Sequence, residues 1–417
     1  MSSSSPVAFR FPPCAIPRPS SAGSTAALAP VLRPWRRSRA LRKGRLSPVA
    51  ANPFDLSPPP IDHDLADSMM AVGGKVSLDG AVETYDNDDE ALDAADNGLA
   101  VVDLSHFGRI RVSGEDRASF LHNQTTANFE CLHEGEGCDT VFVTPTARTI
   151  DIGYAWIMKN AVTLVVSPVT CQSITEMLTK YIFFADKVEI TDITKQTSFL
   201  VLLGPKSGQV MEHLNLKDLD GQPYGSHKHY SINGMPVTVG VGNLVSEEGY
   251  SMLTSPAAAT TVWDILLSHG AIPMGANAWE RLRILRGRPA PGKELTKEFN
   301  ILEAGLWNSI SLDKGCYKGQ ETISRLITYD GVKQSLWGVH LSAPAKPESP
   351  ILVEGKKVGK LTSCTSTREL GHFGLGYIKR QAASEGSTVL VGDDIVGRVV
   401  NLPYLAKQRP LGKKSGS

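Results

Sequence analysis

Residues 311–325 combine several groups that can do chemistry within a span too short to form part of a core. The segment reads SLDKGCYKGQETISR. Cys316 lies two positions after Lys314, and a nearby positive charge favours the thiolate over the thiol. A single cysteine can also be a small buried hydrophobe. The residues alone therefore leave two interpretations of Cys316 open, a reactive thiol and a core residue.

The spacing of this segment also predicts its local structure. An apolar run that begins near Leu306 and ends at Leu312 favours a strand. Gly315 and Gly319 permit backbone angles that other residues avoid, so the chain can turn there close to a ligand. From Gln320 onward the pattern predicts a helix, with an acid and a base four positions apart. Cys316 would then lie near the positive end of that helix.

Lys314-Gly315-Cys316-Tyr317-Lys318-Gly319-Gln320-Glu321 resembles the K-G-C-Y-x-G-Q-E signature of the folate-binding YgfZ family. That family is related to the glycine-cleavage T-protein, a tetrahydrofolate-dependent aminomethyltransferase. The segment DLSHFGRIRVSGEDRASFL resembles the opening of the same superfamily, and the resemblance extends from about Leu99 to Tyr404. It implies a reduced folate bound at the centre of the molecule and a role in making or maintaining iron–sulfur proteins.

The resemblance assigns roles within the signature loop. It implies that Cys316 is the reactive thiol and that Lys314 lowers the pKa of this thiol. The loop would line the mouth of the folate channel, and Gln320 and Glu321 would hold it by hydrogen bonds. The remaining signature positions of the loop are Gly315, Tyr317 and Gly319.

The resemblance also implies folate contacts outside the loop. Glu247 falls on the glutamate of the T-protein's G-E-D-G segment and would bind the pterin, although the residues alone favour an acidic surface turn. Arg283 falls on the arginine of a helix motif, but Trp279 replaces a second arginine and is better explained as a core residue. Asn128 stands where the T-protein has an aspartate that acts in transfer. An amide cannot act as a general base, which weakens a transferase function but leaves folate binding intact.

Charge is distributed unevenly along the chain. Residues 1–54 contain nine basic residues and no acidic residue, and the rest has 34 basic against 43 acidic residues. The first segment is rich in Ser, Pro and Arg, which predicts a plastid transit peptide, with the mitochondrion as second choice. An arginine-rich nucleic-acid patch is the alternative. The acidic remainder argues against a nucleic-acid binder, and no apolar run is long enough to span a membrane.

The cysteine and histidine patterns do not indicate a metal site. The chain has six cysteines and no C-x-x-C motif, and Cys131 and Cys138 are seven positions apart with Glu and Gly residues between them, which is a poor metal-binding spacing. His106 has no neighbouring cysteine or carboxylate cluster and is better explained as a hydrogen-bonded structural residue. We therefore expect no resident metal.

The elements that must position these groups follow from hydrophobic periodicity. Residues 55–97 contain a proline run and an acidic run and predict a linker with one short helix. Asn233-Gly234 between two apolar runs is the clearest hairpin signal. Residues 287–300 must be irregular, and a loop of this length is usually functional. The other expected strands and helices are Leu99–Leu104, Gly108–Val112, Val141–Val143, Thr149–Met158, Val162–Ser167, Ser198–Leu203 and, as helices, Thr170–Phe183, Pro205–Leu214, Val262–Ser268 and Trp279–Arg286.

These observations predict an α+β protein like the T-protein, with two strand-and-helix units and a small all-β barrel around a central folate channel. The expected divisions are a transit peptide at 1–54, a linker at 55–97, a folate-binding body at 98–330, a barrel at 331–407 and a tail at 408–417. The expected function is tetrahydrofolate binding in the chloroplast stroma in support of iron–sulfur assembly, with the assembly machinery or its client proteins as partners. The alternatives are a folate-dependent aminomethyl- or methyltransferase and a non-catalytic adaptor.

Overall fold

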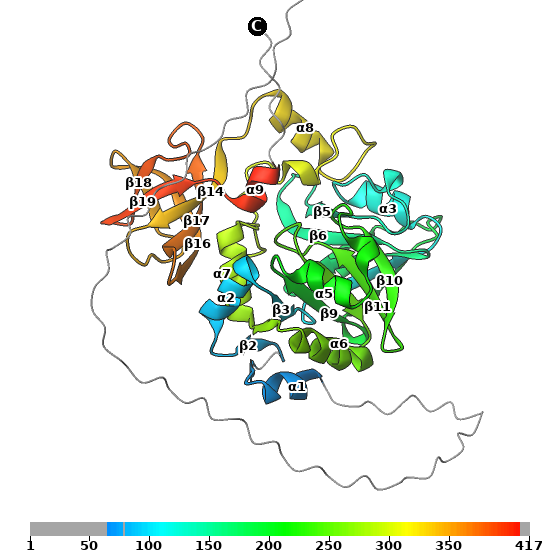
Figure 1. The fold of residues 1–417 in the computed structure, drawn as a ribbon. Helices are drawn as coiled ribbons and strands as arrows, with labels where there is room; N and C mark the ends of the chain where they lie inside the picture. The colour runs from blue at the N-terminus through cyan, green and yellow to red at the C-terminus, as the bar shows by residue number, and fades with distance from the viewer. Residues whose placement is uncertain (1–64, 78–79, 409–417) are drawn as a thin grey trace, which may run out of the picture. The chain divides into compact units, whose positions relative to one another are not determined.

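The structure is a computed structural model that describes residues 65–77 and 80–408 (Figure 1). The expected transit peptide and nearly all of the expected tail lie outside these residues. Strands in the described part form two open sheets, one closed barrel and one two-stranded ladder, and helices pack against the open sheets. This combination of strands and helices with an all-β unit near the C-terminal end confirms the expected fold class.

The first open sheet has six strands in the order β10-β11-β12-β9-β3-β13. Only β13 pairs in parallel with its neighbour. Its central strand β9 is buried on both faces, because Phe199 and Val201 pack on one side and Leu200 and Leu202 on the other. The strands are β3 (Ala100–Asp103), β9 (Ser198–Leu203), β10 (His227–Ile232), β11 (Met235–Val241), β12 (Tyr250–Thr254) and β13 (Ile272–Met274).

Helices cover both faces of this sheet. One face packs against α1 (Leu65–Ala71), α5 (Ser207–His213) and α6 (Pro256–Ser268). The other packs against α2 (Asp88–Asn97) and α7 (Ala276–Arg286), together with Trp156 of the second sheet. Trp279 lies in this shared core and is 6% exposed, as its interpretation as a core residue predicts.

The second open sheet has five antiparallel strands in the order β5-β6-β7-β4-β8. The chain leaves the first sheet after β3, builds this sheet and returns to the first at β9, so the two units are interleaved in sequence. The elements are β4 (Gly108–Ser113), β5 (Gly137–Val143), β6 (Thr149–Ile157), β7 (Ala161–Val166), β8 (Glu189–Asp192), α3 (Arg117–Gln124) and α4 (Cys171–Lys180).

The C-terminal strands close into a barrel in the order β14-β17-β16-β15-β18-β19, and every pairing is antiparallel. Closure leaves the barrel without a free sheet edge. The strands are β14 (Gln334–Leu341), β15 (Pro350–Val353), β16 (Lys356–Thr367), β17 (Gly371–Lys379), β18 (Thr388–Val391) and β19 (Ile395–Val400). The helix α8 (Gln320–Thr328) precedes the barrel and α9 (Pro403–Gln408) follows it.

Two local expectations need correction. The segment before Leu99 is more than a linker, because it forms α1, the ladder of β1 (Lys75–Val76) and β2 (Val82–Thr84), and α2. Met69 and Val82 from this segment are buried, and sequence reasoning gave too much weight to its acidic residues. The strand expected near Leu306–Leu312 is a turn with a short 3-10 helix at Trp307–Ser309.

Other expectations hold. The predicted hairpin is formed by β10 and β11, and Asn233 and Gly234 both have positive φ angles, as a two-residue hairpin turn requires. The expected short helix before Leu99 is α2. Residues 287–300 contain no helix or named strand.

Candidate functional site

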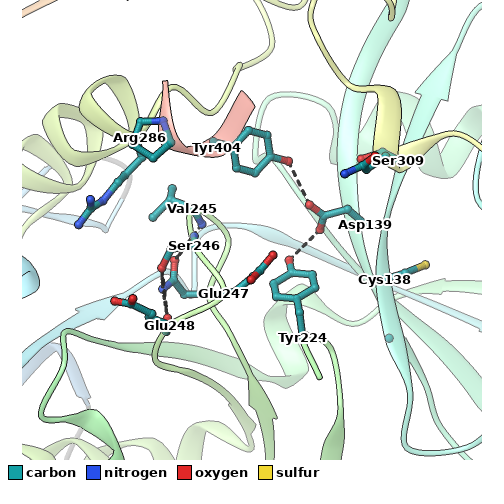
Figure 2. Close-up of a pocket in the computed structure, with 14 residues that line it drawn as sticks. Cys138, Asp139, Tyr224, Val245, Ser246, Glu247, Glu248, Arg286, Ser309 and Tyr404 are labelled. Carbon is teal, nitrogen blue, oxygen red and sulfur yellow. Dashed lines mark hydrogen bonds between the residues drawn. The ribbon is translucent and has the colours of Figure 1, made fainter. Parts of the chain in front are cut away.

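A cavity of about 470 Å³ lies where both open sheets meet the C-terminal helix α9. It takes residues from the start of β5, from the loop between β11 and β12, from the end of α7 and from α9. Figure 2 shows the polar side chains of these elements around one space. The lining residues are Gly137, Cys138, Asp139, Tyr224, Asn243, Val245, Ser246, Glu247, Glu248, Arg286, Asn308, Ser309, Pro403 and Tyr404.

The loop between β11 and β12 is organised by the buried side chain of Asn243. Its Oδ1 accepts hydrogen bonds from the backbone N–H groups of Val245 and Ser246 at 2.8 and 2.9 Å. Its Nδ2 donates to Ser246 Oγ at 2.8 Å and to the carbonyl of Glu248. Since one amide satisfies both ends of the turn, the loop tip is fixed in shape.

Glu247 lies at this loop tip. In Figure 2 its carboxylate is directed towards Tyr224 and Asp139, whereas the carboxylate of Glu248 is directed away from them. The structure therefore brings the residue predicted to contact a pterin to the cavity. Gly242 supports the neighbouring wall: its φ is +88°, and a Cβ there would lie 2.4 Å from the ring of Tyr224.

Asp139, on the opposite wall, is held by two phenols. Its Oδ1 accepts from Tyr224 Oη at 2.8 Å and its Oδ2 from Tyr404 Oη at 3.0 Å. Arg288 Nη1 lies 3.6 Å from Oδ2. Burial raises the pKa of the Tyr224 and Tyr404 phenols above their ordinary value, so both stay protonated and donate.

Arg288 is a buried cation behind this wall rather than a free binding group. It donates to the carbonyl of Leu244, to the carbonyl of Ile152 at 3.3 Å and to Tyr404 Oη at 3.3 Å. Nearby acidic and phenolic groups, with Tyr404 and Asp139 the strongest of them, outweigh burial and raise the pKa of Arg288. The cation at the edge of the cavity is instead Arg286, which is partly exposed and pairs with Asp96.

Two of the predicted folate contacts lie outside the cavity lining. Arg283 is buried and binds Glu280 at 2.7 Å and Glu294 at 2.9 Å. Glu294 is fully buried and also accepts from Thr362 and Ser363 of the barrel, so this ion pair joins α7 to β16. Asn128 caps the short 3-10 helix Phe129–Cys131 by accepting from the N–H of Glu130 at 3.2 Å. In this structure Arg283 therefore joins two elements of the fold, and Asn128 caps a short helix.

Lys314 of the signature loop is buried with its ammonium directed at the end of α3. It donates to the carbonyls of His122, Thr125 and Ala127, the last two at 2.9 and 2.6 Å. A cation is favourable at a helix C-terminus, and burial lowers the pKa of Lys314 to about 8. These three hydrogen bonds attach the signature loop to the end of α3. The expected effect of Lys314 on the Cys316 thiol stays a prediction.

Cys316 is exposed, and the expectation that its loop lines the mouth of the folate channel needs correction, because no residue of 311–325 lines the cavity. The loop runs from the lining residue Ser309 past Cys316 to the start of α8. The N–H of Ser311 donates to the carbonyl of Thr126 at 2.9 Å, and that of Lys318 to the carbonyl of Asn123 at 3.0 Å. The loop is thus attached on both sides of the thiol, and the thiol itself is open to a partner.

The other signature positions support this shape. Gly319 has a φ of +85°, and a Cβ there would lie 2.9 Å from Val143 and 3.0 Å from the carbonyl of Thr144, so only glycine fits. Gly315 does not share the left-handed angle. Tyr317 is buried, with its ring 4.7 Å from the Lys314 ammonium. Gln320 begins α8, and Glu321 pairs with Arg325 in the same helix, in place of the expected bond across the loop.

Sequence reasoning missed Asp139, Tyr224 and Tyr404. Each stands in a stretch without a motif, and they are brought together only by the fold. Among residues 65–77 and 80–408 no group of three or more His, Cys, Asp or Glu side chains is placed to hold a metal ion. No helix in that same part is long and apolar enough to cross a membrane.

The fold and cavity define an α+β protein with two open sheets and a closed barrel, and with a polar, phenol-lined pocket beside α9, the last helix of the described residues. Residues 83–314 match the model of the GCVT N-terminal domain family, which is more than half of the chain, and the chain belongs to that family. It is 69% identical over 381 residues to the "Putative transferase At1g60990, chloroplastic" of Arabidopsis thaliana, which covers 90% of this chain and 88% of that protein.

More distant relatives carry the name of an enzyme. An aminomethyltransferase of Moorella thermoacetica is 26% identical over 75% of this chain and 88% of its own length. The crystal structure of glycine cleavage system aminomethyltransferase T from Bartonella henselae superposes with a TM-score of 0.72. It shares 18% identity and covers 82% of this chain and 97% of its own. This match shows that the fold is that of the aminomethyltransferase.

Proposed function

We propose that this protein is a chloroplast tetrahydrofolate-binding protein of the YgfZ branch of its family that supports the assembly or repair of iron–sulfur enzymes. The observation that carries the proposal is the presentation of Glu247 by the Asn243-ordered loop at a polar cavity. Family membership supports folate as the ligand, and the signature at Lys314–Glu321 supports the YgfZ branch. The name of the Arabidopsis relative supports the plastid.

The residues of the cavity fit a reduced folate. A carboxylate such as Glu247 can accept two hydrogen bonds from the amino and N–H groups at one pterin edge. Val245, Tyr224 and Tyr404 offer apolar and aromatic surface for the rings. Arg286 at the edge can attract the carboxylates of the glutamate tail. The volume of about 470 Å³ lies within the range of ordinary small-molecule sites.

The exposed thiol supplies the second half of the proposal. Cys316 is an exposed residue of the loop that Lys314 attaches to α3, so a partner protein can reach its thiol without entering the cavity. Folate binding would stabilise the body, and Cys316 would act on the iron–sulfur client or its assembly machinery. Titration of the purified protein with tetrahydrofolate tests the first half. Rescue of a strain that lacks the bacterial relative, read as iron–sulfur enzyme activity, tests the second.

A folate-dependent transferase is the second candidate, and the names of the relatives favour it. Asn128 speaks against it, because an amide cannot act as a general base and its Oδ1 accepts a hydrogen bond from the N–H of Glu130. A turnover assay with an aminomethyl donor separates the two. Formation of methylene-tetrahydrofolate would establish the transferase. The third candidate is an adaptor that does not depend on folate. It predicts that Glu247→Ala still rescues the strain that lacks the bacterial relative.

A further inference from the structure

We propose that Asp139 is a specificity-determining residue of the cavity. Asp139 selects ligands that present N–H donors at a second edge of the pterin ring, and so it favours reduced pterins over oxidised ones. This inference rests on the proposed function, in which the cavity holds a folate. It assigns a role to a carboxylate that neither the signature nor the sequence motifs indicate.

The position of Asp139 leaves it an open acceptor. A carboxylate has about four acceptor sites on its two oxygens. Tyr224 and Tyr404 occupy one site on each oxygen, and Arg288 approaches Oδ2 at 3.6 Å. At least one acceptor site therefore remains. Asp139 lines the cavity, and Figure 2 shows it across the space from the loop that carries Glu247.

The surroundings make Asp139 an acceptor and fix its direction. Both phenols stay protonated because burial raises the pKa of each, so each donates its O–H to the Asp139 carboxylate. Tyr224 is packed against Gly242 and Tyr404 lies in α9, so the two donors are anchored independently. A carboxylate held from two sides has little freedom to turn away from a badly matched ligand.

The chemistry of the pterin supplies the discrimination. A tetrahydropterin carries hydrogen on both N5 and N8, and an oxidised pterin has lone pairs at both positions. The reduced ring can donate to Asp139, whereas the oxidised ring places a lone pair against a desolvated carboxylate. Sites built to bind an N–H or O–H group reject analogues that lack it by large factors, because the buried partner is left unpaired.

The test is a pair of dissociation constants measured by anaerobic calorimetry on the full chain, for tetrahydrofolate and for folic acid. We expect the wild-type protein to bind tetrahydrofolate about 100-fold or more tightly than folic acid. In Asp139→Asn the amide can donate to the lone pairs of the oxidised ring, so the ratio should fall to about tenfold or less. Asp393→Asn, which replaces an exposed carboxylate between β18 and β19 outside the cavity lining, is the control and should leave the ratio unchanged.

A second variant covers the case in which Asp139→Asn does not fold. Tyr404→Phe keeps the carboxylate and removes one of its anchors, and it should lower the ratio by a smaller factor than Asp139→Asn. Thermal unfolding of each variant checks its folding. A ratio that equals the wild-type ratio in every folded variant overturns the inference while leaving folate binding in place. If the wild-type protein binds neither probe, the proposed function fails and this inference falls with it.

Discussion

Asp139 and Tyr404 are 265 positions apart in the chain, and their side chains are joined by a 3.0 Å hydrogen bond. The bond runs from β5 of the second sheet to the helix α9 that follows the barrel. The cavity is therefore complete only when the last described helix has packed onto the body. The strongest local motif, at residues 311–325, contributes no residue to the cavity lining.

Glu247 and Glu248 form a matched pair for testing the pterin contact. Glu247→Gln keeps the size of the side chain but loses the charge and one acceptor oxygen. We expect the affinity for tetrahydrofolate to fall about 10- to 100-fold, as for other hydrogen bonds to charged groups. Glu248→Gln should change it less than about threefold, because its carboxylate points away from the cavity centre. Equal losses in both variants, measured by calorimetry, would argue for a general charge effect.

Arg283 and Arg286 lie three positions apart on α7, and replacement by methionine should affect different properties. We expect Arg283→Met to lose stability and Arg286→Met to lose affinity for tetrahydrofolate. Arg283→Met leaves Glu294 buried without its cation, which should cost about 3–5 kcal/mol of unfolding free energy. Arg286→Met, at the cavity edge, should leave stability nearly unchanged and weaken tetrahydrofolate binding several-fold, more at low salt. Denaturant unfolding and calorimetry on both variants check the pair. A stable Arg283→Met protein that binds folate poorly would restore the direct contact expected from the sequence.

Cys316 and Cys131 are both exposed thiols, and only Cys316 belongs to the signature. Cys316→Ala should abolish rescue of a strain that lacks the bacterial relative, while the affinity for tetrahydrofolate stays within about twofold of wild type because the thiol lies outside the cavity. Cys131→Ala should rescue fully. Full rescue by Cys316→Ala would contradict any chemical role for the thiol.

Lys314 gives the stability a defined pH dependence. Burial lowers its pKa in the folded state to about 8, below the value of about 10.4 expected for the unfolded chain. Between these values the unfolded state binds more protons, so the contribution of Lys314 to the unfolding free energy rises as the pH increases. The wild-type protein should therefore gain stability relative to Lys314→Met between about pH 7.5 and 10. Denaturant unfolding at several pH values measures this difference. A difference in unfolding free energy between the two proteins that stays constant with pH would contradict the prediction.

The sequence was sufficient for the elements whose cause is local. The hairpin at Asn233-Gly234 follows from two residues that tolerate positive φ, and β9 follows from a continuous apolar run. The apolar positions Leu306 and Ile310 were ambiguous, because a spacing of four fits a helical turn as well as part of a strand. The task of Arg283 was decided by tertiary contacts. Arg283 has the expected position on its helix, but Glu294 and the barrel determine where its charge goes.

The candidate site shows the same division. Glu247 could be found because a short motif surrounds it, and its loop is ordered by a residue only four positions earlier. Asp139, Tyr224 and Tyr404 carry no local signal, since their meaning arises from contacts over 85 and 265 positions. The chemistry of Cys316 was read from neighbours in sequence, whereas the Lys314 ammonium is directed to α3.

Hydrogen–deuterium exchange with and without tetrahydrofolate tests the central claim most directly, because it reports both binding and its place. The account predicts slower exchange on addition of tetrahydrofolate at residues 137–139, 243–248 and 403–405, with the signature loop at 311–318 little affected. Protection confined to the signature loop, or no change at saturating tetrahydrofolate, would contradict the assignment of the cavity as the folate site.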